Sequence, residues 1–341
     1  MTVLVTGGAG YLGSVLSLAL LEAGYTVRVV DNLMHGGRGL LPLIGHSRFE
    51  FRQADIRDRD VVGRAIEGVD ALVHLAAIVG DPACACASDR ARATNVEASE
   101  LLIGSARAAG VKRFVFTSTC SNYGRMADTS VLATETHDLR PLSLYAETKV
   151  AVEQQLLALP RSPTAFTVLR LATLFGLSPR MRFDLTVNQF VMEMSVRRKV
   201  MVYGERFWRP YVHVRDAARA IIAVLTAPDG SVAGKVFNVG DTDQNYRKVD
   251  LIDIISRRVS DTQVEFVSVA EDPRDYRVSF ERIRSVLGYR TTRSIAAGVD
   301  EIIGALEAGA LGPLDDSAFG NVGAGTRAAP AALAREAVCA P

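Results

Sequence analysis

A tyrosine and a lysine stand four residues apart in the segment Ser143-Leu-Tyr145-Ala-Glu-Thr-Lys149. Residues at this spacing share one face of a helix, so the phenol and the ammonium are predicted to be neighbours. A nearby positive charge lowers the pKa of a phenol from its usual value of about 10 toward the working pH. The pair is therefore predicted to act as a general acid and base.

Hydroxyl side chains are predicted close to that pair. The apolar run at 113–119 ends in Thr119, which is followed by Cys120 and Ser121. Ligands of open α/β sheets bind at the carboxyl ends of the strands, so Thr119 is expected to hydrogen-bond the same substrate oxygen as Tyr145. A Tyr-x-x-x-Lys pair also occurs by chance on exposed helices, and its interpretation depends on the other motifs of the chain.

A glycine-rich turn lies between an apolar run at 2–6 and a helical stretch at 11–23. Glycines in this position let the main chain approach a pyrophosphate, and the N-terminus of the following helix attracts that anion. Glycines alone are weak evidence, because many turns need them. In this context, however, the turn predicts a dinucleotide site lined by Gly7, Gly10, Tyr11, Leu12 and Gly13.

An acidic residue, Asp31, ends the second apolar run about twenty residues beyond the glycines. A carboxylate there accepts hydrogen bonds from the adenosine ribose and repels a 2′-phosphate, so NAD is expected as the cofactor. Arg38 leaves NADP open as an alternative, and an ordinary turn residue is the other interpretation of Asp31.

Alternating elements predict the scaffold for these residues. Apolar runs at 2–6, 26–31, 48–54, 71–76, 112–118 and 165–171 alternate with helical patterns at 11–23, 89–109 and 143–159. This order is typical of an α/β protein with a Rossmann-type doubly wound parallel sheet. Helical stretches near 184–196, 214–226, 247–259 and 294–306 then predict a smaller C-terminal α/β lobe.

The predicted organisation has three parts. Residues 1–175 form a nucleotide-binding domain that carries the catalytic residues, 176–310 form a substrate lobe, and 311–341 form a tail rich in Ala, Gly and Pro. Interleaving of the first two parts is left open.

Composition excludes several classes of function. The net charge of +1 over 341 residues gives no basic surface for nucleic acid. Neither a signal peptide nor an apolar stretch of membrane-spanning length is found, so a cytoplasmic protein without a membrane partner is expected. Cys84, Cys86, Cys120 and Cys339 match no disulfide framework or zinc motif, and no metal is expected.

Taken together, these motifs resemble those of the extended short-chain dehydrogenase/reductases, in particular the NAD-dependent nucleotide-sugar epimerase/dehydratase family typified by UDP-galactose 4-epimerase. The likeness covers about residues 1–306. Besides the residues above, it rests on Asp31-Asn32, Ala54-Asp55-Ile56, His74-Leu75-Ala76-Ala77, Thr94-Asn95 and Arg209-Pro-Tyr-Val-His213-Val-Arg-Asp216.

The resemblance implies further site residues. Asn32, Asp55 and Ile56 would lie at the adenosine, Leu75, Ala76 and Ala77 would lie along the cofactor, and Lys149 would bind the nicotinamide ribose. Thr119 and Tyr145 would hold the sugar hydroxyl that is oxidised. A nucleoside-diphosphate sugar would contact Thr119, Ser121, Asn188, Arg209 and Arg274, although surface ion pairs are the alternative for the arginines. His213 is expected to be structural.

The resemblance also bears on the reaction. In 4,6-dehydratases an Asp-Glu pair follows the hydroxyl residue, whereas here Cys120 and Ser121 follow Thr119. The expected activity is therefore 4-epimerisation through a transient 4-keto sugar. A C3/C5 epimerase using Cys120 as an acid or base, a dehydratase, a decarboxylase, a 4-ketoreductase and a non-catalytic NAD(P)-binding protein stay open. Cys120 itself is expected to be a packed thiol, with the acid/base role as the alternative. A homodimer through 89–110 and the helix of Tyr145 is expected by resemblance.

Overall fold

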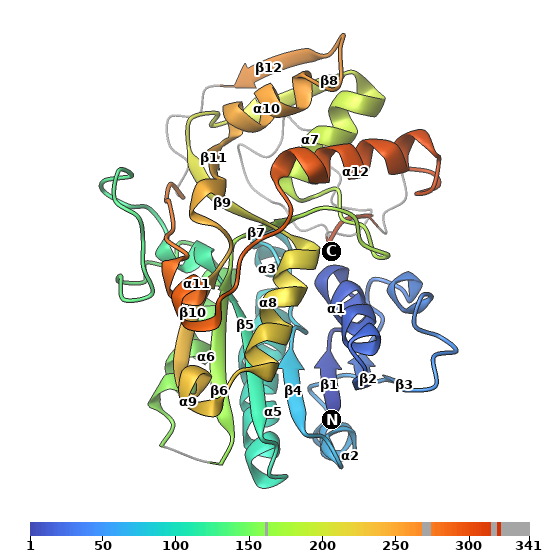
Figure 1. The fold of residues 1–341 in the computed structure, drawn as a ribbon, viewed down its shortest axis with the longest axis vertical. Coiled ribbons are helices and arrows are strands. Elements are labelled where there is room, and N and C mark those ends of the chain that lie inside the picture. The colour runs from blue at the N-terminus through green and yellow to red at the C-terminus, as the bar shows by residue number, and fades with distance from the viewer. Residues whose placement is uncertain (161–162, 268–273, 315–318, 322–341) are drawn as a thin grey trace.

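A sheet of parallel strands forms the centre of the computed structural model, which describes residues 1–160, 163–267, 274–314 and 319–321 (Figure 1). Within these residues the sheet has seven strands, in the spatial order β10 (Lys235–Val239), β6 (Ala165–Leu171), β5 (Arg113–Thr119), β4 (Ala71–His74), β1 (Thr2–Thr6), β2 (Thr26–Asp31) and β3 (Phe49–Gln53). All neighbouring strands run parallel. The predicted doubly wound, Rossmann-type sheet is confirmed.

Helices cover both faces of this sheet because its strands alternate between the faces. Val3 and Val5 belong to the core on one face, and Leu4 belongs to the core on the other. The first face carries α1 (Tyr11–Glu22) and α8 (Val214–Thr226). The second carries α2 (Arg59–Ile66), α5 (Ala98–Ala108) and α6 (Leu144–Ala158). Short helices complete this part of the chain: η1 (Arg38–Leu40), α3 (Asp81–Cys86), α4 (Ser88–Arg92), η3 (Cys120–Tyr123), α9 (Asp229–Val232), η5 (Thr242–Gln244) and α11 (Glu281–Leu287).

The helix predicted at 89–109 is divided. A π-helical turn, η2 (Ala93–Glu97), separates α4 from α5. Its buried Asn95 accepts a hydrogen bond from the Ile78 amide at 2.8 Å and donates to the Ile78 carbonyl at 3.0 Å. Through these two bonds, Asn95 of the π turn fixes the loop that follows β4. Single π turns of this kind are frequent at functional sites.

A smaller lobe lies beyond the carboxyl ends of the strands, at the top of Figure 1. In the described chain it contains a sheet of β11 (Asn245–Arg247), β9 (Trp208–His213) and β7 (Thr173–Phe175), and the parallel pair β12 (Gln263–Val267) and β8 (Lys199–Tyr203). Its helices are α7 (Thr186–Met192) with the π turn η4 (Glu193–Arg197), α10 (Lys248–Ser256) and α12 (Ile295–Glu307).

The chain passes between the two parts more than once. After β9 it returns as α8 to cover the large sheet and as β10 to extend it. The division at residue 175 is therefore crossed by later elements, and a functional division into a nucleotide-binding domain and a substrate lobe stays a prediction.

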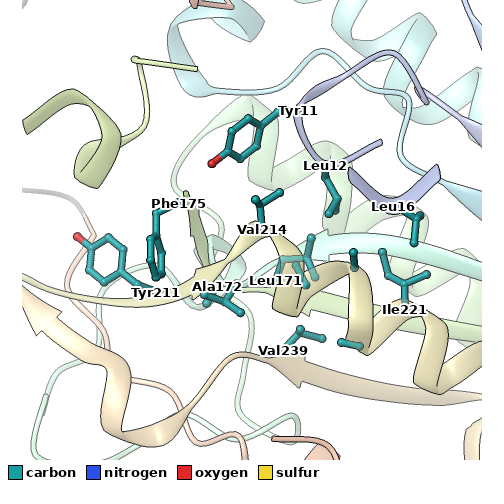
Figure 2. Packing of buried hydrophobic residues seen from close by; sticks show 14 of the residues in the cluster. Tyr11, Leu12, Leu16, Leu171, Ala172, Phe175, Tyr211, Val214, Ile221 and Val239 are labelled. Carbon is teal, nitrogen blue, oxygen red and sulfur yellow. The ribbon is translucent and has the colours of Figure 1, made fainter. Parts of the chain in front are cut away.

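A continuous apolar core joins the two parts. In Figure 2, Leu12 and Leu16 of α1 lie opposite Ile221 of α8, and the same packing continues through Ala172 to Phe175 of the smaller lobe. Phe319, from the segment predicted as a tail, is also buried in this core. Residues 315–318 and 322–341 of that segment lie outside the described residues. None of the described helices combines the length and apolar character needed to cross a membrane.

Candidate active site

The glycine turn forms a cradle at the top of β1. Gly7 has a φ of +77°, and a Cβ there would lie 2.7 Å from the Ala76 amide nitrogen. A Cβ on Gly13 would lie 2.1 Å from the Gly7 carbonyl oxygen, so this glycine lets α1 pack closely on the turn. Gly10 is the N-cap of α1, and no side chain caps the helix there. The N-terminal amides of α1 are therefore left for an anion, which fits the pyrophosphate of a dinucleotide.

Asp31 lies beside the glycine turn. Its carboxylate accepts hydrogen bonds from the amides of Ala9 at 3.0 Å and Leu33 at 2.8 Å, and each oxygen keeps a lone pair for a ribose hydroxyl. Burial raises the pKa of Asp31 despite these two bonds. Asp55, in contrast, pairs with Arg57 at 2.8 Å, and hydrogen bonds from that arginine lower the pKa of Asp55 to about 2.

All residues predicted to bind the cofactor line one pocket. It has a volume of about 1160 Å³, opens to solvent and runs from Asp31 to Lys149. Its lining includes Gly7, Gly10, Tyr11, Leu12, Gly13, Asp31, Asn32, Asp55, Ile56, Leu75, Ala76, Ala77, Tyr145 and Lys149. The structure thus brings together residues that are up to 142 positions apart, counted from Gly7 to Lys149.

Tyr145 and Lys149 lie on α6 at the inner end of this pocket. The Lys149 ammonium is 6.0 Å from the centre of the Tyr145 ring and donates a hydrogen bond of 2.9 Å to the Thr117 carbonyl. Burial lowers the pKa of Lys149 to about 8. The predicted lowering of the phenol pKa is wrong for the protein alone, because burial and the nearby Cys84 raise the pKa of Tyr145. A positive charge brought by a ligand would oppose that shift.

The strand end beside Tyr145 carries the predicted hydroxyls. Thr117 and Ser118 of β5 line the pocket, whereas the predicted Thr119 and Ser121 are not among the described residues that line it. The Thr119 hydroxyl accepts a hydrogen bond from the Ser121 amide at 3.1 Å, and the Ser121 hydroxyl lies 3.4 Å from that of Tyr276. No sequence motif singled out Tyr276, because it comes from a distant loop of the smaller lobe.

Cys120 is a buried thiol. It donates a hydrogen bond to the Arg170 carbonyl at 3.3 Å, and burial raises its pKa far above the usual value. A thiol in this environment is a poor acid or base at neutral pH. This geometry favours the packing role for Cys120 over the catalytic role that the sequence left open.

A buried ion pair behind the pocket was missed in the sequence. Glu153 of α6 contacts Arg170 of β6 at 2.7 Å, and their side chains are 1% and 4% exposed. Asn122 donates to the same carboxylate at 2.7 Å, and Ser118 hydrogen-bonds to it as well. The four-residue spacing from Tyr145 to Lys149 continues to Glu153, which therefore lies on the same helix face. This spacing was the signal that could have found Glu153.

The predicted substrate residues have three different environments. Asn188 is fully buried and accepts a hydrogen bond from the Gly176 amide at 3.0 Å. Arg209 lies over the ring of Tyr276 at 5.3 Å and donates to the Trp208 carbonyl at 2.7 Å. Arg274 contacts Asp81 of α3 at 2.9 Å, which links the smaller lobe to the loop after β4. Substrate contact by each of the three stays a prediction.

Two buried histidines have structural partners. The ring nitrogens of His74 lie 2.8 Å from the Thr6 hydroxyl and 2.9 Å from that of Ser99, and burial lowers the pKa of His74 to about 3. His213 contacts Glu301 at 2.7 Å and accepts a hydrogen bond from the Arg215 amide, which caps α8. Neither ring is placed for proton transfer in the pocket.

Several known proteins are similar to this chain. A 3β-hydroxysteroid dehydrogenase/Δ5→4-isomerase of Mycobacterium tuberculosis is 32% identical over 249 residues, or 71% of this chain, and the matched region spans 65% of that protein. A dTDP-glucose 4,6-dehydratase of Actinoplanes is 30% identical over 319 residues, covering 89% of this chain and 97% of that protein. The solved UDP-glucose 4-epimerase of Thermotoga maritima, with UDP-glucose bound, has a TM-score of 0.80 and 26% identity over 90% of this chain and 99% of that one.

The family match includes the glycine cradle and nearly all of the residues that line the pocket. The description of that family is "NAD dependent epimerase/dehydratase family", and the match covers residues 3–240, from the first residues of β1 to the end of β10. Because this is well over half of its 341 residues, the chain belongs to the NAD-dependent epimerase/dehydratase family.

Proposed function

We propose that this protein is an NAD-dependent epimerase of nucleoside-diphosphate sugars that inverts C4 through a transient 4-keto sugar. The observation that carries the proposal is that Tyr145 and Lys149 lie in the same pocket as the glycine cradle and Asp31. An acid/base pair at one end of a dinucleotide site is the arrangement that reversible oxidation of an alcohol requires.

The geometry of the pocket supports the proposed roles of the cofactor residues, Tyr145 and Lys149, whereas the role of Thr119 rests on the family resemblance. The uncapped N-terminus of α1 binds the pyrophosphate, and Asp31 binds the adenosine ribose. When bound, NAD supplies a reversible hydride acceptor and a positive charge next to the phenol. Tyr145 removes the proton of the C4 hydroxyl and later returns it, and Thr119 orients that hydroxyl. Lys149 is held by the Thr117 carbonyl at a position where its ammonium favours the ionised phenol.

Epimerisation is favoured over dehydration because of the residues that follow Thr119. Elimination of water needs an acid and a base beside the 4-ketone, and here the buried Cys120 thiol and the Ser121 hydroxyl occupy those positions. In epimerisation, the keto sugar rotates in the site and takes the hydride back on its other face. This requires only Thr119, Tyr145, Lys149 and NAD. The proposed reaction, epimerisation, therefore differs from the dehydration for which the 30% identical relative is named.

An anionic substrate is favoured by the arginines of the smaller lobe. Arg209 lies over the ring of Tyr276 and Arg274 pairs with Asp81, and guanidinium groups of this kind suit diphosphate oxygens. The hydroxysteroid dehydrogenase is the main relative that argues for another substrate, because it is 32% identical. Oxidation of a neutral hydroxysteroid is the second candidate activity.

The experiment is product analysis in D2O with UDP-, GDP-, dTDP- and CDP-sugars and with a 3β-hydroxysteroid. A C4 epimer without carbon-bound deuterium supports the proposal. A product that carries deuterium or has lost water or carbon dioxide would assign proton chemistry next to the ketone. Oxidation of the steroid alone, with release of NADH, would assign the second candidate.

We further propose a cytoplasmic homodimer. Helices α5 and α6 lie together on one face of the large sheet, and Leu157 of α6 is 46% exposed there. A second copy placed against these helices would cover that side chain. Sedimentation at several concentrations tests the dimer, and Leu157→Glu is expected to give a monomer.

A further inference from the structure

Arg180 is a buried cation without a carboxylate partner. Its side chain lies in the loop between β7 and α7, and the residue is only 4% exposed. Among the ion pairs of the described residues Arg180 forms none, and its Nε has no hydrogen-bond partner. The guanidinium donates one hydrogen bond, of 2.9 Å, to the Gly320 carbonyl. An unpaired buried charge costs free energy, so its retention points to a ligand that supplies the missing anion.

Nearby carboxylates are engaged by other groups. Asp184 forms two hydrogen bonds with Arg182, at 2.9 and 2.8 Å. Asp31 accepts two main-chain amides, as described above. Burial and the charge of Arg182 lower the pKa of Arg180 to about 10, and burial and both arginines lower the pKa of His35 to about 4. This wall of the pocket thus holds as many carboxylates as guanidinium groups, but both carboxylates are bonded to other groups and neither forms an ion pair with Arg180 among the described residues.

The cofactor pocket is the space that Arg180 faces. Arg180 lines it together with Gly10, Tyr11 and Asp31. The loop of Arg180 is tied to the glycine turn, since the Tyr11 hydroxyl donates to the Gly176 carbonyl at 2.6 Å and the Ser178 hydroxyl donates to the Tyr11 carbonyl at 2.7 Å. Ser178 is two residues from Arg180. The loop of Arg180 is thus tied to the N-terminus of α1, and both line the same pocket.

We propose that Arg180 binds the pyrophosphate of NAD from the side of the smaller lobe, so that the anion lies between this guanidinium and the N-terminal amides of α1. The pyrophosphate is the part of NAD that carries its negative charge, and a guanidinium can donate two parallel hydrogen bonds to it. The inference concerns the cofactor and does not depend on which substrate or reaction the enzyme has.

The segment Phe319–Asn321 positions this arginine. Besides the bond from Arg180 to Gly320, the Phe183 amide donates to the Phe319 carbonyl at 2.8 Å. The side chain of Asn321 donates to the Val79 carbonyl at 3.0 Å, and its main-chain amide donates to Asp184 at 3.2 Å. These contacts connect the loop after β4 with the loop of Arg180 across the pocket. Asn321 itself lines the pocket, so the segment both orients the guanidinium and completes the wall.

The test measures binding by calorimetry on protein freed of dinucleotide, with NAD, NADP, ADP, 2′,5′-ADP and adenosine as ligands. Arg180→Met removes the charge and keeps an apolar stem of similar length. We expect NAD and ADP to bind roughly 10- to 100-fold more weakly, since bonds to a charged group are lost, and adenosine to bind unchanged. The control is Arg206→Met, at an arginine whose side chain is 87% exposed and which does not line the cofactor pocket; this variant should leave all of these affinities unchanged. Arg180→Lys restores the charge and should recover part of the loss.

Three outcomes would overturn the inference. Unchanged NAD and ADP binding would mean that Arg180 does not contact the pyrophosphate. Equal weakening of adenosine would indicate a distorted pocket. Loss confined to NADP and 2′,5′-ADP, with NAD unaffected, would place the 2′-phosphate rather than the pyrophosphate at Arg180.

Discussion

The side-chain amide of Asn188 donates a hydrogen bond of 3.1 Å to the phenol oxygen of Tyr11, although the two residues are 177 positions apart. Tyr11 belongs to the glycine turn and Asn188 to α7 of the smaller lobe. The same phenol donates to the Gly176 carbonyl, so it is satisfied as donor and acceptor. This contact fixes the position of the smaller lobe relative to the cofactor site.

Asn188→Ala is therefore expected to destabilise the protein by roughly 2 to 4 kcal/mol, because it leaves buried partners such as the Gly176 amide unpaired. Tyr11→Phe is expected to cost less, about 1 to 2 kcal/mol. Urea unfolding of the two single variants and the double variant measures the coupling between them. Strictly additive effects would show that the two side chains do not act through their mutual bond.

Tyr145→Phe is expected to lower kcat by roughly 10²- to 10⁴-fold, since the general acid/base is lost. NAD binding should persist, because the glycine cradle and Asp31 are untouched. Turnover and calorimetric NAD titration are measured on the same preparation, with Tyr25→Phe, a tyrosine outside the pocket lining, as the matched control. Full activity of Tyr145→Phe would refute the assigned role.

Lys149 gives a prediction for the pH dependence of stability. Its pKa of about 8 in the folded chain lies below the usual value of about 10.4, so the unfolded chain binds more protons between these values and stability rises with pH there. The free energy of unfolding of the wild type, relative to Lys149→Met, should increase by about 2 kcal/mol from pH 7 to pH 9.5. Urea unfolding at both pH values, without NAD, checks this. A pH-independent difference would show that Lys149 titrates normally.

Breaking the buried pair of Glu153 and Arg170 should destabilise the fold behind the pocket. Glu153→Leu leaves a buried guanidinium without its partner and is expected to destabilise the protein by roughly 3 to 5 kcal/mol. Adding Arg170→Met should recover most of this loss, because an apolar pair avoids the unpaired charge. Thermal unfolding of the single and double variants provides the comparison. Absence of recovery in the double variant would contradict the account.

The sequence predicted the large parallel sheet and its glycine turn well because their signals are local. The turn of Gly7, Gly10 and Gly13 lies between one strand and one helix, and Asp31 ends the next strand, so their neighbours follow from the order of elements. The π turn at Ala93–Glu97 had no such signal, because Asn95 is selected by its contacts with Ile78.

The contacts between distant segments could not be predicted in the same way. The environment of Arg180 depends on Gly320, and Tyr276 meets Ser121 from a loop 155 residues away. The pKa of Tyr145 was predicted in the wrong direction for the protein alone, because its spacing to Lys149 says nothing about burial. Such features require the three-dimensional arrangement of both lobes.

The central claim, that one enzyme-bound hydride leaves C4 and returns to it, is tested most directly with a sugar nucleotide carrying deuterium at C4. After the sugar nucleotide that gives turnover has been identified, its 4-deuterated form is incubated with the protein in ordinary water. The account predicts a C4 epimer that keeps its deuterium at C4, with no deuterated NADH released into solution. An epimer that has lost the deuterium to water, or deuterium that leaves on free NADH, would contradict it.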